Sequence, residues 1–335
     1  MFLIAYILTA CIKGKGRRKR PMPKLKNIAI LGAGTMGVGI AQMFAAAGHE
    51  VMLIYVYDDK VRSRPLETMT DNLNILVSEG VITQDEISST ISRVRFTESL
   101  EEAAAFADVI IECIVENLSV KQNYFQDLDA LCPETTILAT NTSAISVTEI
   151  AEKSLHKERI IGTHFWNPAY LIPLVEVINT KYADPAVIDE MCSILRAARK
   201  MPVVVKKDVP GFLANRMQHA LFREAISIVE NGIADAADVD NAIKYGFGMR
   251  LGVSGPMEVI DRGGTDLTYS IHKYLFPHIE SSTEPSKLLT ELMESGKLGF
   301  KSGEGFQTWR EEDIKASGEN LTKGLIAVIR SLGRL

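Results

Sequence analysis

The chain has 335 residues, of which 46% are hydrophobic and 24% charged, a globular composition long enough for two domains. The formal net charge is −5, so no basic surface for nucleic acid is predicted. The four cysteines lack the spacing of metal ligands, and we predict no metal site and a reducing, cytoplasmic location.

Residues 1–23 begin with an apolar stretch that a basic run follows, MFLIAYILTACIKGKGRRKR. A dozen or so apolar residues are roughly half of what a membrane-spanning helix needs, and a secretory signal carries its charge before the apolar stretch. We therefore predict an extension or disordered tail without stable membrane insertion. A weak membrane-surface anchor and a start at Met22 instead of Met1 both stay open.

Residues 24–208 alternate short β-branched runs with helical patterns, which predicts a mostly parallel, Rossmann-type sheet covered by helices on both faces. The expected strands are NIAIL, EVMLI, DVIIECIVE, TTILAT, RIIGTHFW, PLVEVI and MPVVVKK. HFW and LVEV are separated only by a short proline-containing loop. We expect these two runs to form an antiparallel hairpin at the edge of the sheet.

Residues 209–310 show long segments of helical period and no convincing strand, so we predict an all-α second domain that begins near Pro210 and Gly211. Its apolar faces exceed what one small domain buries, which predicts a homodimer through this domain. The tail, 311–335, contains LTKGLIAVIRSL and is predicted to be helical.

The stretch GAGTMG follows the first expected strand and opens a helix. This order is typical of dinucleotide binding, because small residues let backbone N–H groups and the helix N-terminus approach a pyrophosphate. A tight turn without a ligand is the alternative. The predicted cofactor contacts are Gly32, Gly34, Thr35, Met36 and Gly37.

The second expected strand lacks the acidic residue that usually binds the adenosine ribose of NAD, because Tyr55 stands in its place. Asp58 and Asp59 follow later, and Arg62 and Arg64 could instead meet the 2′-phosphate of NADP. We predict NAD and leave NADP open.

The stretch HFWNPAYLIPLVEV places three polar residues in an apolar run. His164 ends a late strand, where open α/β sheets bind substrates, and an imidazole can serve there as a general base. Glu176 would return across the hairpin to hold His164, and Asn167 would brace the turn or touch the ligand. The alternative is a hydrogen-bonded core histidine and a solvated glutamate.

Several separated motifs in one order give the chain a specific resemblance to the L-3-hydroxyacyl-CoA dehydrogenases over about residues 25–308. The motifs are GAGTMGVGIAQ, IVENLSVKQ, TNTSAISVTEIA, HFWNP with PLVEV, DVPGFLANR and GPMEVID. The resemblance implies an NAD-dependent oxidoreductase acting on a CH–OH group, with hydride passing to or from nicotinamide.

The resemblance also implies site residues. His164 would be the catalytic base and Glu176 its partner, while Ser143 and Asn215 would hold the substrate's oxygen atoms. On the cofactor side it implies Glu116, Lys121 and, in the TNTS motif, Asn141. Ser143 could instead cap the following helix, and Asn215 could instead pack at the domain junction.

The substrate implied first is an L-3-hydroxyacyl-CoA such as 3-hydroxybutyryl-CoA, which would assign the chain to fatty acid metabolism. Members of the family that bind CoA usually carry lysines on the helical insertion after the second strand, yet residues 66–92 contain five acidic residues and no Lys or Arg. The alternative is a carnitine-, gulonate- or pyridine-carboxylate-type substrate, for which Trp166, Tyr170 and Arg262 could line the pocket. A non-catalytic, crystallin-like protein is the remote alternative.

Overall fold

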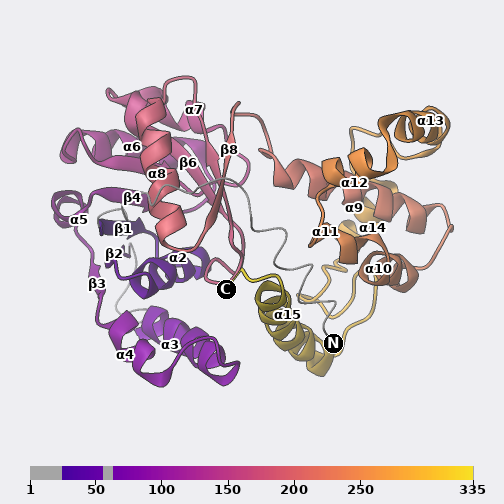
Figure 1. Ribbon diagram of the computed structural model, residues 1–335, viewed down its shortest axis with the longest axis horizontal. Coiled ribbons are helices and arrows are strands. Elements are labelled where there is room, and N and C mark those ends of the chain that lie inside the picture. The colour runs from indigo at the N-terminus through magenta and orange to yellow at the C-terminus, as the bar shows by residue number, and fades with distance from the viewer. Residues whose placement is uncertain (1–24, 56–62, 335) are drawn as a thin grey trace.

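The structure is a computed structural model that describes residues 25–55 and 63–334 (Figure 1). An α/β domain is followed by a helical domain, as the strand and helix patterns of the sequence predict. The first 23 residues, together with Asp58, Asp59 and Arg62, lie outside the described residues.

The α/β domain contains one sheet of eight strands in the order β3-β2-β1-β4-β5-β6-β7-β8. All neighbouring strands are parallel except β6 and β7, which are antiparallel. The strands are β1 (Asn27–Leu31), β2 (Glu50–Ile54), β3 (Val94–Thr97), β4 (Val109–Glu112), β5 (Ile137–Thr140), β6 (Ile160–Phe165), β7 (Leu174–Ile178) and β8 (Met201–Val205).

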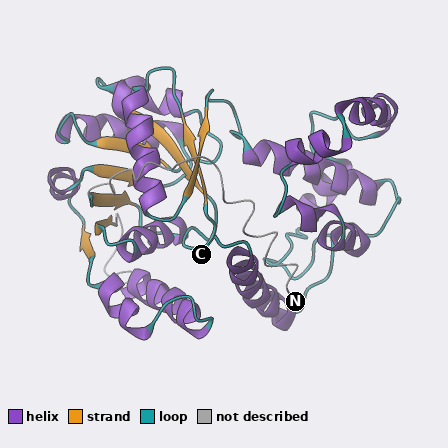
Figure 2. Cartoon of the chain, in the orientation of Figure 1, coloured by secondary structure: helices purple, strands orange, loops and turns teal. Residues whose placement is uncertain are grey.

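Helices cover both faces of this sheet, as Figure 2 shows, because consecutive strand residues point to opposite faces. Ile28 and Ile30 face one apolar cluster, while Ala29 and Leu31 face the other. The first cluster includes residues of α2 (Thr35–Ala46), α3 (Ser63–Ser78), α4 (Gln84–Ile91) and α8 (Pro185–Ala197). The second includes residues of α5 (Leu100–Phe106), α6 (Leu118–Leu131) and the end of α7 (Val147–Ile150).

The predicted Rossmann-type sheet and the antiparallel pair are confirmed, with two corrections. The pair lies one strand inside the edge, because β8 runs parallel to β7 and forms the outer strand. The short strand β3 was not predicted. Its sequence, VRFT, has only four residues and exposes Arg95, so it carries little apolar signal.

The helical domain contains α9 (Ala214–Glu230), α10 (Ala236–Tyr245), α11 (Phe247–Leu251), α12 (Pro256–Gly263), α13 (Thr265–Leu275) and α14 (Lys287–Glu294). None of the helices from α10 to α14 holds a buried residue, although many of their exposed side chains are large and apolar. Within the described residues, no helix is both long and apolar enough to span a membrane.

The last helix, α15 (Glu311–Ser331), returns from the helical domain to the α/β domain. It lies between the two domains in Figure 1. Ile326 and Ile329 are buried in the same apolar cluster as α2 and α3, and the guanidinium of Arg330 donates to the carbonyl of Glu79 at the end of α3. This helix therefore fastens the chain's C-terminal end to the first domain.

Candidate active site

The glycine motif leads from β1 into α2 and leaves the N-terminus of that helix uncapped. Gly34 is the N-cap residue, no side chain caps it, and the first turn carries no acidic residue. The first backbone N–H groups of α2 are therefore available to a phosphate, which the helix dipole also favours.

Each glycine of the motif meets a different constraint. Gly32 has a φ of +113°, and a Cβ there would lie 2.7 Å from the carbonyl oxygen of Cys113. A Cβ on Gly37 would lie 1.8 Å from the carbonyl oxygen of Gly32, so α2 packs too closely on the turn for any side chain. A Cβ on Gly34 would meet nothing within 4 Å. The open space beside Gly34 fits a bound dinucleotide.

Tyr55 follows β2, and its ring packs at a tilt on Phe96 with centroids 5.9 Å apart. Arg64, one of the two arginines considered for a 2′-phosphate, lies on the exposed start of α3.

A buried charge network lies behind the cofactor side of the site. Lys121 of α6 is 1% exposed, and its Nζ lies 2.6 Å from Oε1 of Glu112, whose side chain is fully buried at the end of β4. Glu112 also accepts hydrogen bonds from the hydroxyl of Thr140 and from the N–H of Ile114. Both ends of this buried ion pair are thus hydrogen-bonded, as a stable buried pair requires.

Glu116 connects this network to the loop of Ser143. Its carboxylate lies 3.2 Å from Lys121 Nζ and accepts hydrogen bonds from the hydroxyl of Thr142 and the N–H groups of Ser143 and Ala144. Burial would raise the pKa of Glu116, but the Thr142 hydrogen bond and the charge of Lys121 lower it below its usual range. Glu116 is therefore an anion that fixes the Ser143 loop.

Ser143 is not a helix cap. Ser146 caps α7 instead, with its hydroxyl accepting from the N–H of Glu149. Ser143 is exposed beside the carboxyl ends of β5 and β6, and no hydrogen bond within the described chain uses its hydroxyl. That hydroxyl is available to a ligand.

His164 and Glu176 are register partners across β6 and β7, and Nδ1 lies 2.8 Å from Oε2. Both side chains are buried. An ionised carboxylate can only accept, so the imidazole donates its Nδ1–H and keeps a lone pair on Nε2. Nε2 is thus the nitrogen that can take a proton from a substrate.

Glu176 receives four hydrogen bonds. Oε2 also lies 3.2 Å from the indole Nε1 of Trp166, while Oε1 lies 2.9 Å from the N–H groups of both Leu213 and Ala214 at the start of α9. Burial alone would raise the pKa of Glu176, but the bonds from His164 and the other donors lower it. The carboxylate is ionised at neutral pH and joins the two domains at the dyad.

Three asparagines lie around this centre with different contacts. The side-chain amide of Asn215 donates to the backbone carbonyl of Ser143 at 3.3 Å, so it lies at the domain junction. Asn141 accepts from the N–H of Phe165 at 2.8 Å, a contact between β5 and β6. Asn167 is exposed and precedes a cis proline.

Arg262, Tyr170 and Phe212 have no hydrogen bond to the dyad among the described residues, and their contacts differ. Arg262 is exposed on α12 and pairs with Glu258 of the same helix at 3.0 Å. Tyr170 packs against the first apolar cluster, and burial raises the pKa of its hydroxyl. Phe212, which was not predicted, is buried with its ring centroid 5.7 Å from that of His164.

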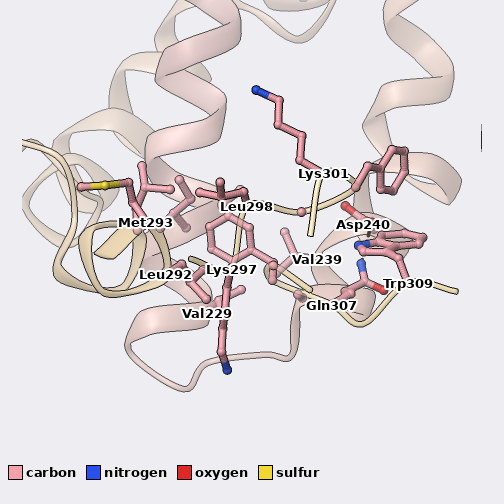
Figure 3. A pocket seen from close by; sticks show the side chains of 18 residues that line it. Val229, Val239, Asp240, Leu292, Met293, Lys297, Leu298, Lys301, Gln307 and Trp309 are labelled. Atoms are coloured by element: carbon pink, nitrogen blue, oxygen red, sulfur yellow. Dashed lines mark hydrogen bonds between the residues drawn. The ribbon is translucent and has the colours of Figure 1, made fainter. Parts of the chain in front are cut away.

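A separate cavity of about 640 Å³ lies within the helical domain (Figure 3). Its lining is mainly apolar and comes from α9, α10, α14 and the segment 297–309, with Trp309 at one end. None of the residues assigned to the dyad or the cofactor lines this cavity.

Family models match almost the whole described chain. The NAD binding domain of 3-hydroxyacyl-CoA dehydrogenase matches residues 27–209, and the C-terminal domain of the same family matches residues 211–309. The chain belongs to the 3-hydroxyacyl-CoA dehydrogenase family. It is an NAD-dependent oxidoreductase acting on CH–OH groups, and the uncapped helix and open Gly34 fit its cofactor.

Two curated relatives differ in what their names say they act on. A 5-formyl-3-hydroxy-2-methylpyridine 4-carboxylate 5-dehydrogenase of Mesorhizobium japonicum is 35% identical over 313 residues, 92% of this chain and 98% of the relative. A probable 3-hydroxybutyryl-CoA dehydrogenase of Bacillus subtilis is 36% identical over 290 residues, 86% of this chain and 99% of the relative.

A solved structure extends the first comparison. The crystal structure of a 5-formyl-3-hydroxy-2-methylpyridine 4-carboxylic acid 5-dehydrogenase, described as an NAD⁺-dependent dismutase, is 34% identical with a TM-score of 0.85, and the match covers 92% of this chain and 99% of that one. The fold predicted from the sequence is therefore that of known family members.

Proposed function

We propose that this enzyme oxidises a compact carboxylate that carries a hydroxymethyl or aldehyde group, a non-CoA substrate of the pyridine-carboxylate type. The observation that carries the proposal is the acidic helical insertion α3–α4, with no Lys or Arg from Leu66 to Ser92 to meet the phosphates of CoA. The 313-residue match to the pyridine-carboxylate enzyme supports it.

The dyad would act through Nε2 of His164. In oxidation of an alcohol, Nε2 takes the hydroxyl proton as the carbon loses its hydride, and a carbonyl forms. The hydrate of an aldehyde presents the same H–C–O–H unit, so water addition followed by the same step yields a carboxylic acid. Bound NAD supplies the hydride acceptor.

The supporting residues would prepare the substrate for this step. The hydroxyl of Ser143 and the amide of Asn215 are proposed to hold the substrate's oxygen atoms, since both lie at the junction of the two domains. Glu176 stabilises the imidazolium as it forms, and the rings of Trp166 and Phe212 exclude water from it.

An L-3-hydroxyacyl-CoA is the second candidate. The relative named 3-hydroxybutyryl-CoA dehydrogenase, 36% identical over 290 residues, favours it. This candidate would place the enzyme in fatty acid metabolism.

One set of assays separates the two candidates. Reduction of NAD⁺ and of NADP⁺ is measured with 5-formyl-3-hydroxy-2-methylpyridine 4-carboxylate, and oxidation of NADH and of NADPH with acetoacetyl-CoA and free acetoacetate. We expect saturable turnover of the pyridine aldehyde with a preference for NAD⁺ over NADP⁺. Saturable turnover of acetoacetyl-CoA alone would overturn the proposal and establish the thioester substrate.

We also propose that the enzyme is a homodimer through its helical domain. Tyr245, Tyr269 and Tyr274 are at least 70% exposed on helices without buried residues, and a second copy of the chain could cover these rings. Sedimentation equilibrium tests this, and a monomer at micromolar concentration would contradict it. A cytoplasmic location remains a prediction.

A further inference from the structure

Trp166 contacts both members of the dyad. Its indole Nε1 lies 3.2 Å from Oε2 of Glu176, the oxygen that also lies 2.8 Å from Nδ1 of His164. Its ring lies beside the imidazole, with centroids 5.5 Å apart. One carboxylate oxygen is therefore shared between the imidazole and the indole.

We infer that Trp166 is a positioning residue that sets how strongly Glu176 holds the proton of His164. A carboxylate oxygen distributes its negative charge over the donors that it accepts. The indole N–H takes part of the charge on Oε2, so the bond to Nδ1–H is weaker than it would be alone. The inference rests on the dyad of the proposed function and not on the identity of the substrate.

The other neighbours of Glu176 cannot replace the indole. The N–H groups of Leu213 and Ala214 bind Oε1, the opposite oxygen. Phe212 faces His164 with a ring that has no polar hydrogen. Trp166 is thus the neighbour whose hydrogen bond lowers the charge that Oε2 presents to Nδ1–H of His164.

His164 and Glu176 are the titratable groups of this cluster. The elements next to them are β8, where the uncharged Val203 is the register partner of Glu176, the loop after β6 and the start of α9. The loop contributes the indole of Trp166, and α9 with the residue before it contributes two backbone N–H groups. The other charged groups of the site are Glu112, Glu116 and Lys121. They contact one another and the loop of Ser143, and none of their contacts within the described residues is with His164 or Glu176.

Trp166→Phe tests the inference because it keeps an aromatic ring and removes only the donor. Without the indole, Nδ1–H of His164 would be the remaining donor to Oε2 of Glu176. The carboxylate would then stabilise the protonated imidazole more strongly. The acidic limb of kcat/KM for oxidation and the basic limb for reduction should both move to higher pH, by roughly 0.5 to 1 pH unit. Trp309→Phe is the matched control and should leave both limbs in place.

A parallel shift of both limbs distinguishes positioning from a purely structural role, which would change KM or stability without moving the limbs. Unchanged limbs in a folded Trp166→Phe enzyme would overturn the inference.

A second measurement needs no substrate and uses protein labelled with ¹⁵N-tryptophan. Trp309→Phe leaves Trp166 as the single indole resonance, because the chain has two tryptophans. We expect this N–H to exchange slowly with solvent and to move upfield in the Glu176→Gln variant. An indole N–H resonance that does not shift in Glu176→Gln would contradict the hydrogen bond from Trp166 to Oε2. A responsive indole in an enzyme that turns over none of the assayed substrates would uphold the inference and reject only the substrate proposal.

Discussion

His164 and Glu176 lie directly opposite each other in the antiparallel register of β6 and β7, with Nδ1 2.8 Å from Oε2. Glu176→Gln removes the negative charge that would stabilise the imidazolium. It also replaces one carboxylate oxygen by an NH₂ group, although all four neighbours of Glu176 donate hydrogen bonds to it. We predict that kcat falls by roughly 10²- to 10⁴-fold, the usual contribution of general acid–base catalysis. Steady-state kinetics measures the loss, and NADH titration is the control. An active variant with normal kcat would remove Glu176 from the dyad.

The glycine motif offers a matched pair of variants. Gly37→Ala places a Cβ 1.8 Å from a backbone oxygen and should lower the melting temperature, whereas Gly34→Ala places one in open space and should fold normally. Gly34→Ala should nevertheless bind NADH more weakly, because the added methyl would occupy the space in which we expect the pyrophosphate to bind. Thermal unfolding and NADH fluorescence titration measure both effects. Equal NADH affinity in Gly34→Ala and the wild type would place the cofactor elsewhere.

Lys121 and Glu112 form a buried ion pair. We therefore expect substitutions of the two residues to have strongly coupled effects on the free energy of unfolding. Lys121→Met leaves a carboxylate buried without its cation and should lower the free energy of unfolding by about 3 to 5 kcal/mol. Adding Glu112→Gln removes the unpaired charge and should recover part of that loss. Urea denaturation of both single variants and the double variant forms a mutant cycle. Strictly additive effects would argue against the pair.

Lys200 predicts how stability depends on pH. Burial lowers the pKa of this side chain to about 8, although its Nζ donates to the carbonyls of Ala169 and Ile172 at 2.5 and 2.8 Å. Between about pH 8 and the ordinary value of 10.5 the unfolded chain binds more protons, so stability should rise with pH in this window. The gain is at most about 3 kcal/mol.

Lys200→Met is the variant that isolates this effect, because Met fills similar space without a charge. Its free energy of unfolding, measured by urea denaturation from pH 7 to 11, should lack the rise that the wild type shows. The same slope in both proteins would assign the pH dependence to other groups.

The fold and the dyad could be predicted because their signals are local. The glycine spacing, each strand pattern and the short loop between His164 and Glu176 can each be recognised within one short stretch of sequence. Five features escaped prediction. Trp166 lies in the same hairpin as the dyad, but its role as a donor depends on which way the indole points and not on its place in the sequence. The α9 amides and Phe212 reach the dyad from 36 or more residues beyond Glu176, and β3 is short. Glu112 did carry a signal, a charge that ends an apolar strand, which predicts a buried partner.

Comparison of the wild-type enzyme with His164→Gln tests whether His164 is the catalytic base. NADH formation or consumption is followed with whichever assayed substrate turns over, and NADH affinity is measured on both proteins. We expect unchanged NADH affinity and a kcat that is lower by a factor of roughly 10² to 10⁴. A His164→Gln enzyme that binds NADH and turns over like the wild type would contradict the assignment of His164 as the catalytic base.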